Sequence, residues 1–61
     1  MISVKLEYLL VERWGSVAVA WPWMVSPNPD LDGLSPWEVC EKGHHDVIED
    51  MVEDMLLGHP S

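Results

Sequence analysis

Apolar and acidic residues alternate at the helical period over the last third of the chain. Apolar residues recur every three or four positions, and acidic residues fill the opposite side of the implied helix. The apolar set is Val47, Ile48, Met51, Val52, Met55 and Leu56. The acidic set is Asp46, Glu49, Asp50, Glu53 and Asp54. The pattern predicts an amphipathic helix over residues 45–57 that ends at Gly58, with the apolar residues up to Met55 in the core and the acidic set in water.

A shorter helix is predicted over residues 36–41 by its start signals. Ser35 is a typical N-cap, Pro36 takes the first helical position, and Glu38 follows at the spacing of a capping box. Gly43 then separates this helix from the last one.

A corner is predicted over residues 26–34. Pro27 and Pro29 disfavour helical backbone at the residues before them, and Gly33 permits a positive φ just ahead of the next helix. This segment is therefore expected to be a defined turn and not a flexible linker.

The first twenty residues fit two patterns. Apolar and polar residues alternate from Ile2 to Tyr8, as in a half-buried strand, but the apolar run of residues 9–11 breaks the alternation. Gly15 and Ser16 could close one helix and cap the next, or turn a hairpin into residues 17–20. Local pattern alone slightly favours a β-hairpin followed by two helices over the other fold that it permits, an all-α bundle of three to four short helices.

Composition indicates one small folded domain over residues 1–61. A chain of 61 residues is near the size at which one hydrophobic core only just offsets chain entropy. Its 48% hydrophobic residues do not fit a disordered chain. We therefore expect some apolar surface to be buried by a partner, with the four tryptophans facing the core, namely Trp14, Trp21, Trp23 and Trp37.

The net charge of −8 argues against direct binding of nucleic acid, because phosphate contacts require clustered Lys and Arg. It is typical of either a basic protein partner or simple solubility. The single cysteine, Cys40, excludes an intramolecular disulfide, and we expect a reducing, cytoplasmic location. No signal peptide is recognised, and residues 17–25 are too short an apolar run to span a membrane.

Candidate catalytic and metal-binding residues are few. Cys40, His44, His45 and His59 are the possible zinc ligands, but Gly43 interrupts the helix that would bring the first two together, and no second ligand pair follows. A catalytic thiol would need a formed pocket and an orienting third group. We expect no metal, no cofactor and no enzymatic activity, with the cysteine in the core and two histidines at a helix start.

The corner and the helices around it resemble the C-terminal toxin-binding domain of Xre/MbcA/ParS-type antitoxins over roughly residues 16–58. The elements of the resemblance fall in the order Trp23, Met24, Pro27, Asn28, Leu31, Gly33, Ser35 and Pro36, followed by Glu41-Lys42-Gly43 and the run from Val47 to Gly58. The resemblance implies an all-helical bundle and so decides against the hairpin. The helices are then expected over residues 4–14, 17–25, 36–41 and 45–57.

The resemblance also implies a function, which is to bind and neutralise a RES-domain toxin that consumes NAD by covering its active site. The partner-binding residues would be the chain end and the acidic helix face, namely Glu49, Glu53, Leu56, Leu57, Gly58, His59, Pro60 and Ser61. The signature residues would hold the fold without touching the toxin, namely Trp23, Pro27, Asn28, Leu31, Gly33, Ser35 and Pro36.

Two features depart from that family. Its antitoxins usually carry an N-terminal helix-turn-helix domain for which these 61 residues leave no room, so direct operator binding is not expected. Pro22 lies where a helix is expected, which requires a kink or a helix that begins at Pro22. The alternative function is a stand-alone structural or adaptor module of a mobile element that oligomerises or binds another protein.

Overall fold

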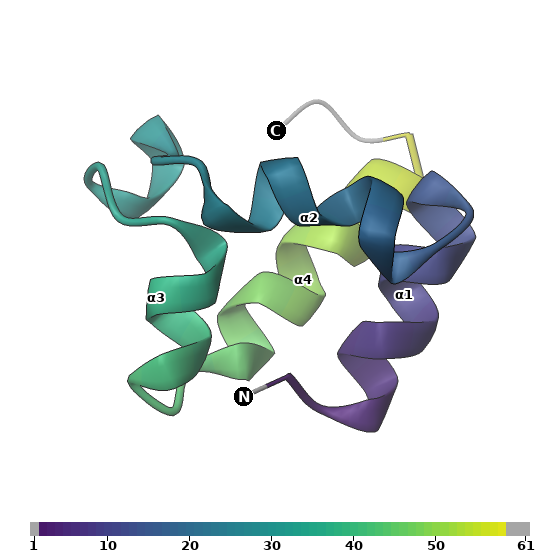
Figure 1. The fold of residues 1–61 in the computed structure, drawn as a ribbon, viewed down its shortest axis with the longest axis horizontal. Coiled ribbons are helices and arrows are strands. Elements are labelled where there is room, and N and C mark those ends of the chain that lie inside the picture. The colour runs from purple at the N-terminus through teal and green to yellow at the C-terminus, as the bar shows by residue number, and fades with distance from the viewer. Residues whose placement is uncertain (1, 59–61) are drawn as a thin grey trace.

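Four α-helices follow one another in the computed structural model, which describes residues 2–58 (Figure 1). They are α1 (Val4–Trp14), α2 (Val17–Val25), α3 (Pro36–Glu41) and α4 (His45–Leu56), with a 3-10 turn, η1 (Pro29–Leu31), between α2 and α3. Residues 2–58 contain no strand, so the all-α bundle is confirmed and the N-terminal hairpin is wrong. No helix within this range is long and apolar enough to cross a membrane.

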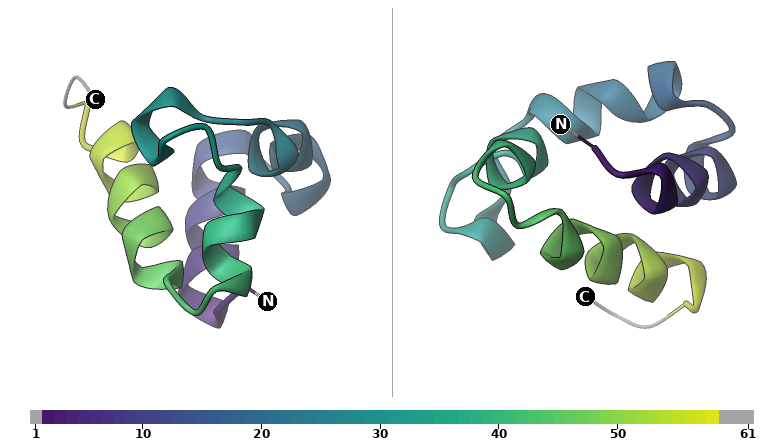
Figure 2. Two further views of the ribbon diagram at one scale, coloured as in Figure 1. Left: turned by 90° about the vertical axis from the view of Figure 1, so that its left-hand side faces the viewer. Right: turned by 90° about the horizontal axis from the view of Figure 1, so that it is seen from below.

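Each helix packs on the next helix in sequence, and α4 also packs on α1. The helices therefore form a closed frame. The main interfaces in the described part are α1 with α2, α2 with α3, α3 with α4, and α4 with α1. Seen from below, α2 and α4 lie on opposite sides of the frame, with α1 and α3 between them (Figure 2). Inside lies one core, made of Leu6, Leu10, Ala20, Met24, Val39, Cys40, Ile48 and Val52.

Gly15 and Ser16 explain why the N-terminal third is helical. Gly15 takes a left-handed conformation (φ +93°), and its N–H donates to the Val11 carbonyl at 2.8 Å, which ends α1. Ser16 starts α2, since its hydroxyl accepts from the Val19 N–H at 3.1 Å. This pair therefore joins two helices, and Leu6 and Leu10 both face the core from α1.

The corner after α2 is held by backbone hydrogen bonds around Asn28. The Asn28 carbonyl accepts from the N–H groups of Leu31 and Gly33 at 3.0 and 3.1 Å, and the Asn28 N–H donates to the Leu34 carbonyl at 2.9 Å. Gly33 has φ +86°, as predicted. The corner is thus a hydrogen-bonded turn that fixes where η1 lies.

The capping box at the start of α3 is confirmed. The Ser35 hydroxyl accepts from the Glu38 N–H at 3.2 Å, and the Glu38 carboxylate accepts from the Ser35 N–H at 3.0 Å. These bonds favour the charged carboxylate and hold the pKa of Glu38 below its usual value. Pro36 follows at the first helical position and is fully buried.

Pro22 lies inside α2, which runs unbroken from Val17 to Val25 instead of beginning at Pro22. Proline has no N–H to donate to the carbonyl of Ala18, and Ala18 is exposed to water that can take that place. The Ser26 hydroxyl donates to the Pro22 carbonyl at 2.5 Å near the end of the helix. The expected helix over residues 17–25 is therefore confirmed, and of the two ways proposed to accommodate Pro22, a helix that begins at this proline is wrong.

The tryptophans lie in two ring pairs. Trp14 and Trp23 have ring centroids 5.0 Å apart, and Trp21 and Trp37 have centroids 5.1 Å apart. Trp14, Trp23 and Trp37 pack against the core, but Trp21 is 37% exposed. The expectation that all four face the core is therefore wrong for Trp21, which covers Trp37 from outside.

Candidate functional site

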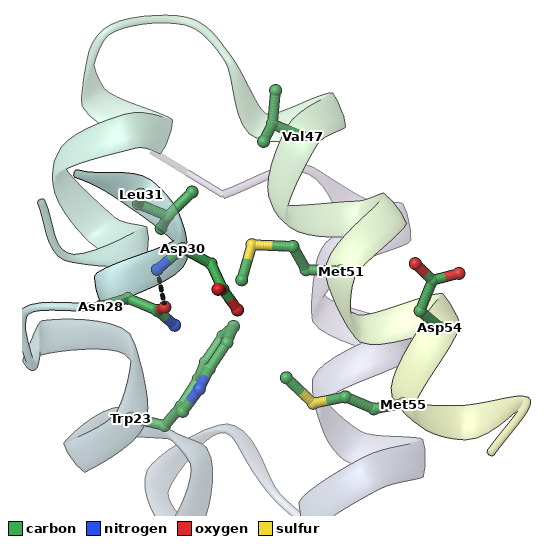
Figure 3. Close-up of a pocket in the computed structure, with 8 residues that line it drawn as sticks. All are labelled: Trp23, Asn28, Asp30, Leu31, Val47, Met51, Asp54 and Met55. Carbon is green, nitrogen blue, oxygen red and sulfur yellow. Dashed lines mark hydrogen bonds between the residues drawn. The ribbon is translucent and has the colours of Figure 1, made fainter. Parts of the chain in front are cut away.

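A groove lies between α4 and the segment formed by the end of α2 and η1 (Figure 3). Its volume is about 260 Å³. It is lined by Trp23, Asn28, Asp30 and Leu31 on one side and by Val47, Met51, Asp54 and Met55 on the other. We call it the α4 groove. It remains open because the main interfaces of α4 are with α1 and α3, and neither helix covers this side.

The wall of the groove opposite α4 is held in place by contacts with neighbouring residues of the domain. The ring of Trp23 packs against Trp14, and the Arg13 guanidinium carbon lies 4.9 Å from the centre of the Trp14 ring. The Asp30 N–H donates to the Asn28 side-chain oxygen at 2.9 Å, which anchors the first turn of η1. Figure 3 shows the Asp30 carboxylate turned toward the space between Trp23 and α4.

Two methionines form the α4 side of the groove. Met51 and Met55 are one helical turn apart, and both side chains point from α4 toward η1 and Trp23 (Figure 3). Both are half-buried, whereas Met24 lies fully in the core. Asp54 lies at the outer edge of the groove, with its carboxylate turned away from the methionines. The groove therefore combines apolar side chains with the Asp30 carboxylate inside it and the Asp54 carboxylate at its outer edge.

The groove has the size and chemistry to hold a side chain of another molecule. Its volume is below the range of about 300–1,000 Å³ that is usual for small-molecule sites. Its lining contains no cysteine, histidine or lysine, the side chains that most often act as nucleophile or base. An apolar side chain from another molecule is the ligand that these walls suit best.

Glu49 occupies a different position from the one predicted. It is only 7% exposed, on the side of α4 that faces the start of α1. Its Oε2 accepts a short hydrogen bond from the Ser3 hydroxyl and lies 2.9 Å from His45 Nδ1. The expectation that Glu49 faces water on a partner-binding surface is wrong, because this carboxylate joins α4 to the N-cap of α1. We call these three residues the Ser3–Glu49–His45 cluster.

The hydrogen bond from Ser3 is the main reason that the pKa of Glu49 lies below its usual value. Burial acts in the opposite direction, and the hydrogen bond and charge of His45 add to the lowering. The Ser3 hydroxyl also accepts from the Leu6 N–H at 3.0 Å, so one side chain caps α1 and binds α4.

The orientation of α4 about its own axis, which buries Glu49, also turns Val47 outward. Val47 was expected in the core with the other apolar residues of this helix, but it is 41% exposed. Ile48 and Val52 are fully buried, as predicted, and Met51 and Met55 lie at the edge. Helical periodicity also predicted Val47, Met51 and Met55 in the core, so it gave the apolar face of α4 only approximately, and packing against α1 set the final orientation of the helix about its axis.

The remaining acidic residues of α4 lie at the surface. Glu53 Oε1 is 3.5 Å from Lys5 Nζ in a partly exposed ion pair, and Asp46 and Asp50 are exposed. Exposed pairs of this kind contribute about 0–1 kcal/mol to stability. Glu53 is thus accessible to a partner, whereas Glu49 is not.

The chain end carries exposed apolar residues. Leu57 follows the last residue of α4 and is 69% exposed, and Leu56 is also exposed. Gly58 has a positive φ and lies just past the helix, at the predicted end. The predicted partner-binding residues His59, Pro60 and Ser61 lie outside the described residues.

The possible zinc ligands within residues 2–58, Cys40, His44 and His45, do not form a metal site. Cys40 is buried in the core, and this burial raises the pKa of its thiol. His45 lies against Glu49, and His44 precedes α4 without capping it through its side chain. In residues 2–58 no three His, Cys, Asp or Glu side chains are grouped to hold a metal ion. His59 lies outside this range.

The signature residues have two locations. Ser35 and Pro36 are buried at the start of α3, while Pro27 and Gly33 are exposed in the corner. The others, Trp23, Asn28 and Leu31, line the α4 groove together with Asp30, Met51 and Met55, which were not predicted as site residues. The spacing of Met51 and Met55 was visible in the sequence, but periodicity alone assigns such a pair to the core.

No protein-family model matches this chain, and neither a curated protein nor a solved structure is significantly similar to it.

Proposed function

We propose that this protein is a non-enzymatic, antitoxin-type binding module of the cytoplasm that neutralises a RES-domain toxin by covering its NAD-binding active site. The proposal starts from the resemblance of residues 16–58 to the toxin-binding domain of Xre/MbcA/ParS-type antitoxins. The all-helical bundle is compatible with it. The observation that carries it is the exposed apolar end of α4, formed by Leu56 and Leu57.

Leu56 and Leu57 contribute little to the core of the isolated domain, which ends on α4 at Val52. A leucine buried against a partner contributes about 1.5–3 kcal/mol to the free energy of association. Glu53 lies one turn earlier and Asp50 two turns earlier at the surface of the same helix. They could bind Arg or Lys residues of a pocket that normally holds a pyrophosphate.

The direct test is a leucine substitution with a matched control. Leu57→Ser should weaken inhibition of NAD consumption by a purified RES-domain toxin roughly tenfold. Val4→Ser is the control, because Val4 is 71% exposed and Leu57 is 69% exposed, but Val4 lies on α1. Equal inhibition by both variants and the parent protein would contradict the proposal.

Deletion of residues 58–61 provides a second test. These residues follow the last core position, so circular dichroism should show an unchanged helical fold. Inhibition of NAD consumption should nevertheless fall, since the chain end is expected at the toxin's pocket. Full inhibition by the truncated protein would favour the adaptor alternative.

The adaptor alternative rests on α1. Val4, Tyr8 and Val11 are spaced by four and three residues, are all exposed, and lie opposite the buried Leu6 and Leu10. An apolar row of this kind is typical of a helix that pairs with another helix. If the protein is an adaptor that self-associates through this row, sedimentation equilibrium will give more than one chain per particle, and Tyr8→Glu will return it to a monomer.

A further inference from the structure

We propose that the α4 groove is a docking site for a basic segment of a partner protein, with one apolar side chain seated between Trp23 and the two methionines and a Lys or Arg held at Asp30. This inference goes beyond the proposed function, since it requires neither the chain end nor a RES-domain toxin. It rests on the shape, the lining and the charge of the groove.

The apolar part of the ligand follows from the walls. Met51 and Met55 are unbranched and polarizable, so they adapt to side chains of different shape. The flat ring of Trp23 faces them. The ring of Trp14 packs against the ring of Trp23, with 5.0 Å between the ring centroids, and so supports it. A volume of about 260 Å³ accepts a large aliphatic or aromatic side chain and excludes a folded domain. One anchoring side chain in a preformed pocket is the usual centre of a peptide-binding site.

The basic part of the ligand follows from the charges. The Asp30 carboxylate is turned into the groove and Asp54 stands at its outer edge, in a protein of net charge −8. A Lys or Arg beside the anchor can pair with Asp30 and lie over the ring of Trp23. The surrounding negative potential attracts basic segments and repels acidic peptides and nucleic acids.

A second copy of this chain is a poor occupant of the groove. It would bring another net charge of −8 and has only three Lys or Arg residues. Of these, Lys5 is paired with Glu53 and Arg13 packs on the ring of Trp14. The charge balance therefore indicates an unlike, basic partner.

Methionine methyl NMR tests the proposal within one molecule. Met51 and Met55 line the groove, and Met24 is fully buried in the core, so it serves as an internal control. The probe is an amidated amphipathic peptide of Leu and Lys, and its counterpart has Glu in place of every Lys. The basic peptide should shift the Met51 and Met55 methyl signals while Met24 stays in place. No shift, or equal shifts with the acidic peptide, would overturn the proposal.

Charge variants locate the basic contact. Asp30→Asn should weaken binding of the basic peptide about two- to fivefold and reduce its dependence on salt, as expected for an exposed charge pair. Asp46→Asn makes the same change of charge on an exposed residue of α4 that does not line the groove. Equal weakening by the two variants would mean that only net charge matters and would overturn the assignment to the groove.

Met51→Lys tests the apolar contact, since a cation at the wall should abolish binding of the basic peptide. Circular dichroism and the position of the Met24 methyl signal will show that the variant is folded. Retained binding by a folded Met51→Lys protein would overturn the proposal. None of these measurements uses a toxin, so failure here leaves the neutralisation assays unaffected.

Discussion

Helix α4 has two very different sides. Toward α1, Ile48 and Val52 are fully buried in one core with Leu6 and Leu10, and the carboxylate of Glu49 is buried beside them in the Ser3–Glu49–His45 cluster. Toward η1, Met51 and Met55 are half-buried and a groove of about 260 Å³ remains.

The length of the opposing element explains the difference. Helix α1 has 11 residues and forms one of the main interfaces of α4, whereas η1 has three residues and forms none of the main interfaces of α4 among the described residues. A short turn cannot fill the surface of a helix of 12 residues, so long side chains bridge the space only in part. The side that α1 covers stabilises the domain, and the side that η1 leaves open is available for binding.

The largest expected effect is on the α1 side. Ile48→Ala should lower the free energy of unfolding by roughly 2–5 kcal/mol, because it leaves a cavity in the closed part of the core. Met51→Ala, on the open side, should cost only about 1–2 kcal/mol, since its side chain is half exposed. Urea denaturation followed by circular dichroism measures both. Equal losses would mean that the two sides of α4 are packed alike.

The corner that carries η1 should depend on Gly33. Its φ of +86° disfavours a side chain, although no atom lies within 4 Å of the position that a Cβ would take. Gly33→Val should therefore cost about 1–3 kcal/mol through backbone strain alone. Gly33→Asn should cost less, because Asn tolerates left-handed backbone. An unchanged thermal midpoint for Gly33→Val would contradict this account of the corner.

The polar cluster on the α1 side should make stability depend on pH. Ser3→Ala removes the N-cap of α1 and the hydrogen bond to Glu49, and should cost about 1–2 kcal/mol at neutral pH. Because the pKa of Glu49 is lower in the folded protein than its usual value of 4.5, the cluster stabilises the fold above that pH. This contribution is lost as the pH falls through the folded pKa.

The difference in stability between the parent protein and Ser3→Ala should therefore shrink on acidification below pH 4.5. Ser16→Ala is the matched control, since Ser16 caps α2 without binding a carboxylate. Its cost should stay nearly constant over the same pH range. Thermal unfolding at a series of pH values measures both, and parallel curves for the two variants would show that Glu49 does not contribute.

The smallest effect is expected for Asp50→Ala. Asp50 is exposed, so its loss should change stability by less than about 0.5 kcal/mol. Glu49→Ala should cost clearly more, although the two acids are neighbours in sequence, because Glu49 is buried with Ser3 and His45. Chemical denaturation of the two variants compares them directly. A larger cost for Asp50→Ala than for Glu49→Ala would contradict the burial of Glu49 and therefore the orientation of α4 about its axis.

Local sequence determined the fold from the corner to α4, whereas for residues 1–20 the local pattern slightly favoured a hairpin and only the family resemblance predicted the helices that the structure contains. Ser3, Ser16 and Ser35 are N-caps, Gly15 and Gly43 separate helices, and each acts through backbone groups within a few residues. Caps and turns satisfy backbone hydrogen bonds locally, so their positions can be predicted without knowing what packs where. All four helix ranges expected for the bundle agree with the structure to within one residue at each end.

Tertiary structure alone decided the site. Glu49 and Asp50 are adjacent acidic residues that sequence does not distinguish. Glu49 is the buried one because Ser3, 46 residues away in sequence, packs against it. Val47 and Ile48 are equally apolar, and the packing of α1 on α4 decides that Val47 faces the groove. Periodicity predicts which residues share a helix face, but the rotation of that face and any gap beside it depend on the length and position of the neighbouring elements.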